Sequence, residues 1–196
     1  MAEPAVALMT IREFLDWDSG DGRHYELIDG RPVAMTSPSA AHSRLVSRLG
    51  QHIANLLDAR PPCGVNTQAA IALPGDDRTC YEADLAVTCQ ALRADQRIME
   101  EPLLAIEVLS PSTKGFDLTT KLEDYRLIPS VQEIALIDSQ SVYAQIHRRT
   151  SSGQWLTEII SGRASVLRLS SVGLELPMST LYQGTGVDDR RPRAQG

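Results

Sequence analysis

The stretch Leu103–Leu109, LLAIEVL, decides the fold, because it is a short and nearly continuous apolar run that ends at Ser110-Pro111. A run of this length bounded by a proline is typical of a central strand that is covered on both faces. One carboxylate, Glu107, interrupts it. Burying an ionised carboxylate without a partner costs so much free energy that the group takes up a proton instead. To stay ionised, Glu107 requires a charge partner, hydrogen-bond donors or a metal.

A second carboxylate lies on the strand predicted for Cys80–Val87, CYEADLAV. Alternation places Tyr81, Ala83, Leu85 and Val87 on one face of this strand, and Glu82, Asp84 and Ala86 on the other. If the two strands are adjacent, Asp84 and Glu107 meet. Paired carboxylates at strand ends form a hard oxygen site suited to Mg²⁺ or Mn²⁺, with waters and the Val108 carbonyl as further ligands, and are less suited to zinc.

The segment that follows predicts a helix over residues 113–127. Within it Asp117, Lys121 and Tyr125 have the spacing i, i+4, i+8 and share one stripe. A right-handed turn back onto the sheet places Lys121 above the end of the strand that carries Glu107. The sequence therefore predicts a site of two acids and one base: Asp84, Glu107 and Lys121.

The other patterns surround this strand with a mixed sheet. Thr10-Ile11-Arg12-Glu13 is a capping box that begins a short helix, and an Asp29-Gly30 turn joins two strands in a hairpin. Apolar residues at helical spacing predict a long amphipathic helix between 37 and 58. Further strands are expected at 64–73, 132–137 and 142–147, with a C-terminal β meander over 155–169.

These elements indicate the α/β class, in its mixed α+β form, with helices packed on a central mixed sheet. We expect one domain over residues 1–183 and a disordered tail over 184–196. A chain of 196 residues that is 42% hydrophobic can bury a core without disulfides or a structural metal.

The location expected from the sequence is the cytoplasm. Cys63, Cys80 and Cys89 are odd in number and contain no C-x-x-C pair, which argues against a disulfide framework and a zinc knuckle and favours a reducing compartment. The sequence has neither a signal-peptide pattern at its start nor an apolar run long enough to span a membrane.

A formal net charge of −6 disfavours broad binding to nucleic-acid phosphates, so any such contact has to be local. Most of the basic residues are expected to be solvated surface groups. The candidates for a local contact are Arg44, Arg48, Lys114, Lys121, Arg148, Arg149, Arg190, Arg191 and Arg193.

Taken together, these motifs resemble the Uma-type restriction endonuclease family, within the PD-(D/E)XK nuclease superfamily. The resemblance covers most of the chain. It rests on Tyr25–Gly30 followed by Ser37-Pro38 and His42, on Asp84–Val87, on Ile106–Thr113, and on Asp117, Lys121 and Tyr125. By this similarity the fold is a restriction-endonuclease-like core, and Asp84 and Glu107 correspond to the two acidic metal ligands of the superfamily.

The chain departs from the superfamily pattern at three places. Ala83 stands where a proline is usual, and Leu109 occupies the lysine position of the second motif. The resemblance implies that the family supplies this cation from the following helix instead, where the corresponding residue of this chain is Lys121. The segment Glu133–Asp138 also lacks the aromatic residues that the family tends to carry there.

The resemblance implies a Mg²⁺- or Mn²⁺-dependent endonuclease that hydrolyses phosphodiester bonds, with DNA as its partner and a homodimer as its assembly. Lys121 would orient the attacking water and offset transition-state charge. Glu26 resembles an additional acid near the metal, and His42 is a candidate contact to a phosphate or to the metal's surroundings. The alternative is an inert module of the same fold that binds nucleic acid or a protein, which Leu109 and the acidic surface favour.

Each candidate also has a structural interpretation. Glu107 could form a buried ion pair with Lys121 or Arg126, although such pairs stabilise poorly compared with apolar packing. Asp84 could face solvent, His42 could cap its helix or lie on the surface, and Tyr125 could be a core aromatic. Ser110 and Ser112 lie outside any G-x-S-x-G elbow, which excludes an obvious serine hydrolase.

Overall fold

The computed structural model describes residues 8–111 and 114–189, and an eight-stranded mixed sheet forms its centre. The strands follow the order β2-β1-β4-β5-β6-β7-β8, and β3 pairs with β4. The β5–β6 pair is parallel, while the other pairs described in this sheet are antiparallel. Their bounds are β1 Tyr25–Ile28, β2 Arg31–Ala34, β3 Gly64–Ala72, β4 Cys80–Thr88, β5 Pro102–Leu109, β6 Glu133–Asp138, β7 Tyr143–Arg149 and β8 Trp155–Ser161.

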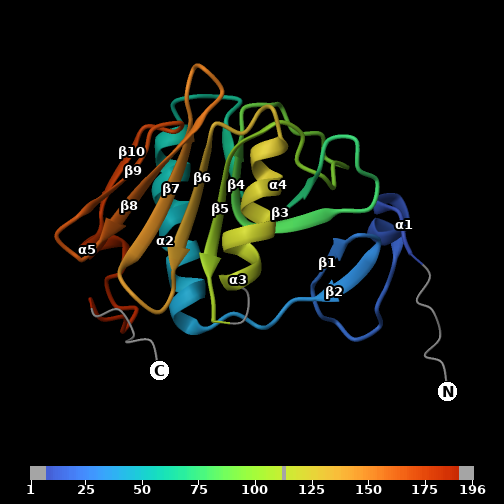
Figure 1. The fold of residues 1–196 in the computed structure, drawn as a ribbon, viewed down its shortest axis with the longest axis horizontal. Helices are drawn as coiled ribbons and strands as arrows, with labels where there is room; N and C mark the ends of the chain where they lie inside the picture. The colour runs from blue at the N-terminus through green and yellow to red at the C-terminus, as the bar shows by residue number, and fades with distance from the viewer. Residues whose placement is uncertain (1–7, 112–113, 190–196) are drawn as a thin grey trace.

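Helices cover both faces of this sheet, as the sequence predicted. In Figure 1, α4 passes in front of the strands and α2 behind them, while α1 lies beside β1 and β2 at one end of the molecule. The bounds are α1 Ile11–Asp16, α2 Ala40–Leu57, α3 Lys114–Phe116, α4 Leu122–Leu127 and α5 Met178–Leu181, and a π-helical segment, η1 Asp117–Lys121, joins α3 to α4.

The long helix α2 forms where its apolar spacing predicted it. Ser39 is its N-cap, and the Ser39 hydroxyl accepts a hydrogen bond from the His42 backbone N–H at 3.2 Å. Leu45, Leu49 and Ile53 are fully buried against the sheet. Leu56, which was expected in the same stripe, is 39% exposed and faces away from the core.

Strand β5 is covered on both faces, as its apolar run predicted. Ile106 and Val108 pack in the core cluster on the α2 side, whereas Ala105 and Leu109 pack in the cluster on the α4 side. Glu107 on this strand is only 3% exposed.

Strand β4 is longer than β1 and β5, the two strands that pair with the same edge of it. β3 pairs with one edge along its whole length, from Ala72↔Cys80 to Gly64↔Thr88. On the opposite edge β1 pairs at Cys80 and β5 pairs from Leu85 onward. The edge is therefore shared by two strands, and Asp84 lies in the fork between them.

The C-terminal part differs from the single meander that the sequence predicted. β8 continues the main sheet, but β9 Val166–Leu169 and β10 Leu174–Pro177 form a separate two-stranded sheet, followed by the unpredicted α5. Leu167, Leu169, Leu174 and Leu176 from this hairpin are buried in the α2-side cluster. The hairpin thus packs on the face of the sheet instead of extending its edge.

The tail expected to be disordered packs on the domain over the part that the structure describes. The Gly184 carbonyl accepts a hydrogen bond from the Arg44 side chain, and Val187 is buried in the α2-side cluster. Residues 184–189 are therefore in contact with the rest of the domain in this structure. Residues 190–196, including the three C-terminal arginines, lie outside the described residues.

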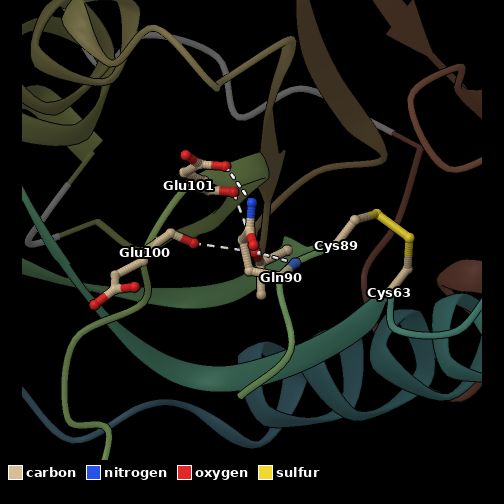
Figure 2. The surroundings of a disulfide bond; sticks show 6 residues. Cys63, Cys89, Gln90, Glu100 and Glu101 are labelled. Atoms are coloured by element: carbon tan, nitrogen blue, oxygen red, sulfur yellow. Dashed lines mark hydrogen bonds between the residues drawn. A yellow bond between two sulfur atoms is a disulfide. The ribbon is translucent and has the colours of Figure 1, made fainter. Parts of the chain in front are cut away.

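A disulfide joins Cys63 to Cys89, contrary to the interpretation of the cysteine pattern. The pair continues the β3–β4 register by one step beyond Gly64↔Thr88, which brings the two thiols to one point although 26 residues separate them. Figure 2 shows the bond beside Gln90, whose side chain contacts Glu101. The three cysteines therefore comprise one disulfide-bonded pair and one buried free thiol, Cys80. Within the described residues, no helix is both long and apolar enough to cross a membrane.

Candidate functional site

Lys121 lies at the centre of a buried cluster of carboxylates. Its Nζ is 2.7 Å from Glu26 Oε1, 3.3 Å from Glu107 Oε1 and 3.6 Å from Asp117 Oδ1. All four side chains are less than 10% exposed. Strand β1, strand β5 and the π-helical segment thus bring together three of the predicted site residues, and Arg126 pairs with Glu123 instead of Glu107.

The π-helical segment aligns this cluster. In an α-helix, residue i+4 is rotated by about 40° around the helix axis relative to residue i. A π-helical turn contains more than four residues, so the same interval in η1 rotates the side chain in the opposite direction and offsets the rotation in α4. Asp117, Lys121 and Tyr125 consequently all face the sheet, at 3%, 4% and 0% exposure.

Glu107 is held by two donors on a single oxygen. Tyr125 donates its hydroxyl hydrogen to Glu107 Oε1 at 2.7 Å, and Lys121 donates to the same atom. Burial raises the pKa of Glu107 above its usual range, against the opposing effect of Lys121 and with further repulsion from Asp84. Tyr125 is therefore a core aromatic, as its structural interpretation held, but its hydroxyl ends at the site.

The cation at the centre is strongly held. Burial alone lowers the pKa of Lys121, but attraction to Glu107, Glu26 and Asp117 outweighs burial and raises it. The Nζ atom also lies 5.5 Å from the centre of the Tyr81 ring, within cation–π range. Sequence reasoning missed Tyr81, because simple alternation along the strand placed it on the face opposite Asp84.

Asp84 occupies the fork between β1 and β5. The Val108 backbone N–H donates to Asp84 Oδ2 at 2.7 Å, so the side chain takes the place of a missing strand neighbour. Continuing the Leu85↔Ile106 register by one step places Asp84 beside Glu107. The Asp84 side chain is 18% exposed, against 4% for Glu107, so it is the more accessible of the two acids.

The alternation predicted for β4 is wrong in its first half. Leu85 and Val87 pack in the α2-side cluster, but Tyr81 and Ala83 pack with Ala86 in the α4-side cluster. The sequence placed all four on one face, as a straight strand would. The change occurs at Asp84, where β4 exchanges one edge partner for another and where the β3–β4 pairing is interrupted opposite Gln68, whose φ is 50°.

His42 joins the site from the first turn of α2. Its Nε2 lies 3.2 Å from Asp84 Oδ2, while its Nδ1 is buried and has no hydrogen-bond partner. Ser39 and not His42 caps the helix. The histidine is therefore neither a cap nor a surface residue, and it lies close to the more accessible acid.

Glu26 has a structural contact as well as its ion pair. Its Oε1 accepts a hydrogen bond from the Glu82 backbone N–H at 2.9 Å, on the edge of β4 that faces β1. Glu26 and Asp84 therefore make equivalent contacts on either side of the fork. Side chains, in place of backbone carbonyls, satisfy the strand amides where the ladder separates.

The donors at the fork fit a hard divalent cation. The described hydrogen bonds and ion pairs of the two acids use Asp84 Oδ2 and Glu107 Oε1, which leaves Asp84 Oδ1 and Glu107 Oε2 as available oxygens. Carboxylate oxygens with several waters are the ligands that Mg²⁺ prefers. No three His, Cys, Asp or Glu side chains converge into a metal cage within the described residues, so such an ion would depend on these two acids, a carbonyl and water.

The other basic candidates in the described part of the chain are engaged elsewhere. Arg44 and Arg48 donate to backbone carbonyls of residues 184 and 180, and Arg149 donates to the carbonyls of 126, 128 and 131. Arg148 pairs with Glu133 and Glu158, and Lys114 pairs with Asp138. These side chains hold the fold together, and the structure does not gather them at the fork.

Comparison with known proteins gives a consistent result. A family model described as "Uma2: Putative restriction endonuclease" matches residues 11–179. Two uncharacterized proteins of Synechocystis sp. (strain ATCC 27184 / PCC 6803 / Kazusa) are similar along their length. The protein slr1290 is 32% identical, with 88% of this chain and 90% of the relative covered, and sll1609 is 25% identical, with 85% and 96% covered.

The fold has a solved counterpart. A crystal structure described as "a putative nuclease belonging to DUF820" from Anabaena variabilis ATCC 29413 superposes with a TM-score of 0.72. The superposition covers 89% of this chain and 97% of the other at 20% sequence identity. At this identity the likeness establishes the fold, which agrees with the nuclease-type core expected from the sequence.

Proposed function

Because this chain belongs to the Uma2 family of restriction endonuclease-like proteins, we propose that it is a metal-dependent endonuclease that hydrolyses phosphodiester bonds in DNA. The observation that carries the proposal is the joint position of Lys121 and Glu107 beside Asp84 at the fork of the sheet. A buried cation and two acids from separate elements are the groups that phosphodiester hydrolysis requires.

Asp84 and Glu107 would hold Mg²⁺ or Mn²⁺ together with the Val108 carbonyl. When bound, the ion would polarise the phosphate and make a water molecule more acidic. Lys121 would orient the attacking water and offset negative charge in the transition state. Glu26 would keep Lys121 in position through its 2.7 Å contact, and His42 would orient the Asp84 carboxylate.

The second candidate, an inert module that binds nucleic acid or a protein, is favoured by two observations. Leu109 stands at the superfamily's lysine position and is 1% exposed, so no cation comes from the strand. Lys121 is itself shared among three carboxylates. If these contacts persist when DNA binds, Lys121 cannot orient the attacking water molecule.

Nicking of supercoiled plasmid with Mg²⁺ or Mn²⁺, compared with EDTA, separates the two candidates. We expect nicking by the wild type, and its loss in EDTA and in the Asp84→Asn and Lys121→Ala variants. Lys114→Ala is the matched control, because the chain has only these two lysines and Lys114 pairs with Asp138 away from the fork. Equal nicking by wild type and Asp84→Asn would refute the endonuclease proposal.

A metal titration shows whether the acids bind the ion independently of catalysis. A ligand that binds only the folded state raises the melting temperature. Mg²⁺ is expected to raise the melting temperature of the wild type and not that of Asp84→Asn. A rise in Asp84→Asn equal to that in the wild type would place the ion elsewhere.

We also propose a homodimer located in the cytoplasm with its DNA substrate. β8 is the last strand of the main sheet, and Leu156 and Ile159 on it are 64% and 62% exposed, which supports pairing with a second copy.

Reducing systems of the cytoplasm keep most cysteines as thiols, so Cys63 and Cys89 are expected to be reduced there. Thiol alkylation before cell lysis, followed by mass measurement, tests this location.

A further inference from the structure

A hollow of about 460 Å³ lies between α1, the loop that follows it and the strands β1 and β4. Four of its lining side chains are aromatic: Phe14, Trp17, Tyr25 and Tyr81. Only 5% of the chain is aromatic, so this is a local concentration. The hollow belongs to the end of the molecule where α1, β1 and β2 lie together (Figure 1).

The aromatic rings present flat surfaces that are not fully used by the core. Trp17 and Tyr25 are in edge-to-face contact at 4.9 Å between ring centres, and Phe14 stacks near Trp17 at 6.3 Å. All three are partly exposed, whereas Tyr81 is buried. Partly exposed rings at the wall of a hollow are the surfaces on which nucleobases stack.

Polar groups in the hollow suit the edge and the backbone of a nucleotide. The half-buried Glu82 carboxylate, 3.2 Å from His24 Nδ1, can accept a hydrogen bond from the exocyclic amino group of a base. Arg23 and Arg97 at the rim are 61% and 52% exposed. Their ion pairs with surface aspartates are weak, so either arginine can contact a phosphate instead.

The hollow adjoins the candidate site through strand β4. The Glu82 backbone N–H donates to Glu26, which holds Lys121, and the Tyr81 ring lies under the same lysine. Asp84 follows two residues after Glu82 on this strand. The hollow and the candidate site therefore share strand β4, with Glu82 lining the hollow and Asp84 lying at the fork.

We propose that this hollow binds an unpaired nucleobase and that the protein acts on DNA whose bases are unstacked, above all single-stranded DNA. A base inside a duplex cannot enter a lined hollow unless it leaves the stack, and the free-energy cost of leaving is least where the base is already unpaired. Glu82 selects bases that carry an amino group, such as cytosine, over thymine. The inference rests on the proposed function, because it places the neighbouring phosphate at Asp84 and Glu107.

The experiment measures binding in EDTA, where no cleavage occurs. Trp17 and Trp155 are the only tryptophans, so Trp155→Phe leaves Trp17 as the sole indole fluorophore. The probes are oligodeoxycytidylate, oligodeoxythymidylate of the same length and a hairpin duplex. We expect oligodeoxycytidylate to quench Trp17 fluorescence and to bind more tightly than either of the other two.

Variants test the individual contacts by fluorescence anisotropy of labelled probes. Trp17→Ala is expected to weaken binding of oligodeoxycytidylate about tenfold or more, since it removes one base–aromatic stack. Trp155→Ala removes the same side chain from β8 and is the matched control, with unchanged affinity. Glu82→Gln is expected to abolish the preference for cytidylate over thymidylate.

Absence of Trp17 quenching, or equal affinity of wild type and Trp17→Ala for oligodeoxycytidylate, would overturn the inference even if the protein nicks plasmid. Absence of nicking would instead refute only the endonuclease proposal. Because base binding is measured without metal, a protein whose Trp17 fluorescence is quenched but which never cleaves would still support base binding in the hollow.

Discussion

Lys121 shows how much a single residue depends on its surroundings. In the sequence it is an ordinary helical lysine four residues after an aspartate, and only its expected position above Glu107 distinguished it. Glu26, which contacts it most closely at 2.7 Å, is separated from it by 95 positions in the chain and reaches it through the β1–β4 contact. Spacing could predict the Asp117 contact, but not the one made by β1.

Replacing Lys121 with methionine is expected to destabilise the fold by about 3–5 kcal/mol, because it leaves three buried carboxylates without their cation. Urea unfolding monitored by circular dichroism measures the free energy of unfolding. Lys114→Met, which removes a lysine that is 45% exposed, should cost much less. A loss in Lys121→Met no larger than in Lys114→Met would mean that the carboxylates do not need the lysine.

His147 gives a residue-scale prediction away from the site. The side chain is 3% exposed, and its Nδ1 lies 3.1 Å from Arg126 Nη2. Burial and the Arg126 charge lower the pKa of His147 from 6.5 to about 4. Between these values the unfolded chain binds a proton that the folded chain does not, so stability is complete above pH 6.5 and is lost as pH falls toward 4.

The free energy of unfolding of the wild type is therefore expected to fall more between pH 6.5 and 4 than that of His147→Gln, by about 1–3 kcal/mol. Urea titrations across this range measure both slopes. The variant is the control for the carboxylates that titrate in the same range. Parallel slopes would show that His147 is protonated equally in both states.

At the scale of elements, the sequence predicted most of the regular structure. The Thr10–Glu13 capping box begins α1, the Asp29-Gly30 turn joins β1 to β2, and the apolar run forms β5. These signals are local, since each rests on residues within one or two turns of the chain. The fork in the sheet and the β9–β10 hairpin depend on which strands become neighbours, and no local pattern encodes that.

The π-helical segment is the element on which alignment of the site depends. Deletion of Thr120 is expected to convert it to α-helix and to rotate Asp117 by about 100° relative to Lys121. We predict at least a tenfold loss of plasmid nicking with the helical circular dichroism signal preserved. The Thr120→Ala variant keeps the chain length and should behave as the wild type, because Thr120 is exposed. Full activity of the deletion variant would show that the segment's geometry is irrelevant.

At the scale of the whole molecule, the order of the predicted elements indicated the mixed α+β class, but the number and spacing of the cysteines were misinterpreted. Counting and spacing cannot show that Cys63 and Cys89 are cross-strand neighbours, because their proximity follows from the β3–β4 register. The acidic net charge was informative, since the structure engages most of the described basic candidates in internal contacts. The proposed binding to DNA would then depend on few groups, in agreement with the two arginines at the rim of the aromatic hollow.

No strand in the described part of the chain pairs with the outer edge of β8, which leads to a prediction about assembly. Two copies that pair their β8 strands antiparallel would extend the main sheet across a two-fold axis and cover Leu156 and Ile159. Sedimentation is expected to give a dimer for the wild type and a monomer for the double variant Leu156→Lys, Ile159→Lys. Leu92→Lys, at a site that is 53% exposed, is the control and should remain dimeric. A dimeric double variant would place the interface elsewhere.

The shared edge of β4 also determines how the molecule can open. The hairpin of β1 and β2 meets β4 at Leu27↔Cys80, and the pair of Glu26 with Lys121 crosses the same junction. Detaching this hairpin would therefore break the ion pair and leave Lys121 without its nearest carboxylate. Amide exchange in β1 and integrity of the cluster should belong to one cooperative unit, so that the N-terminal hairpin is native only while the site is assembled.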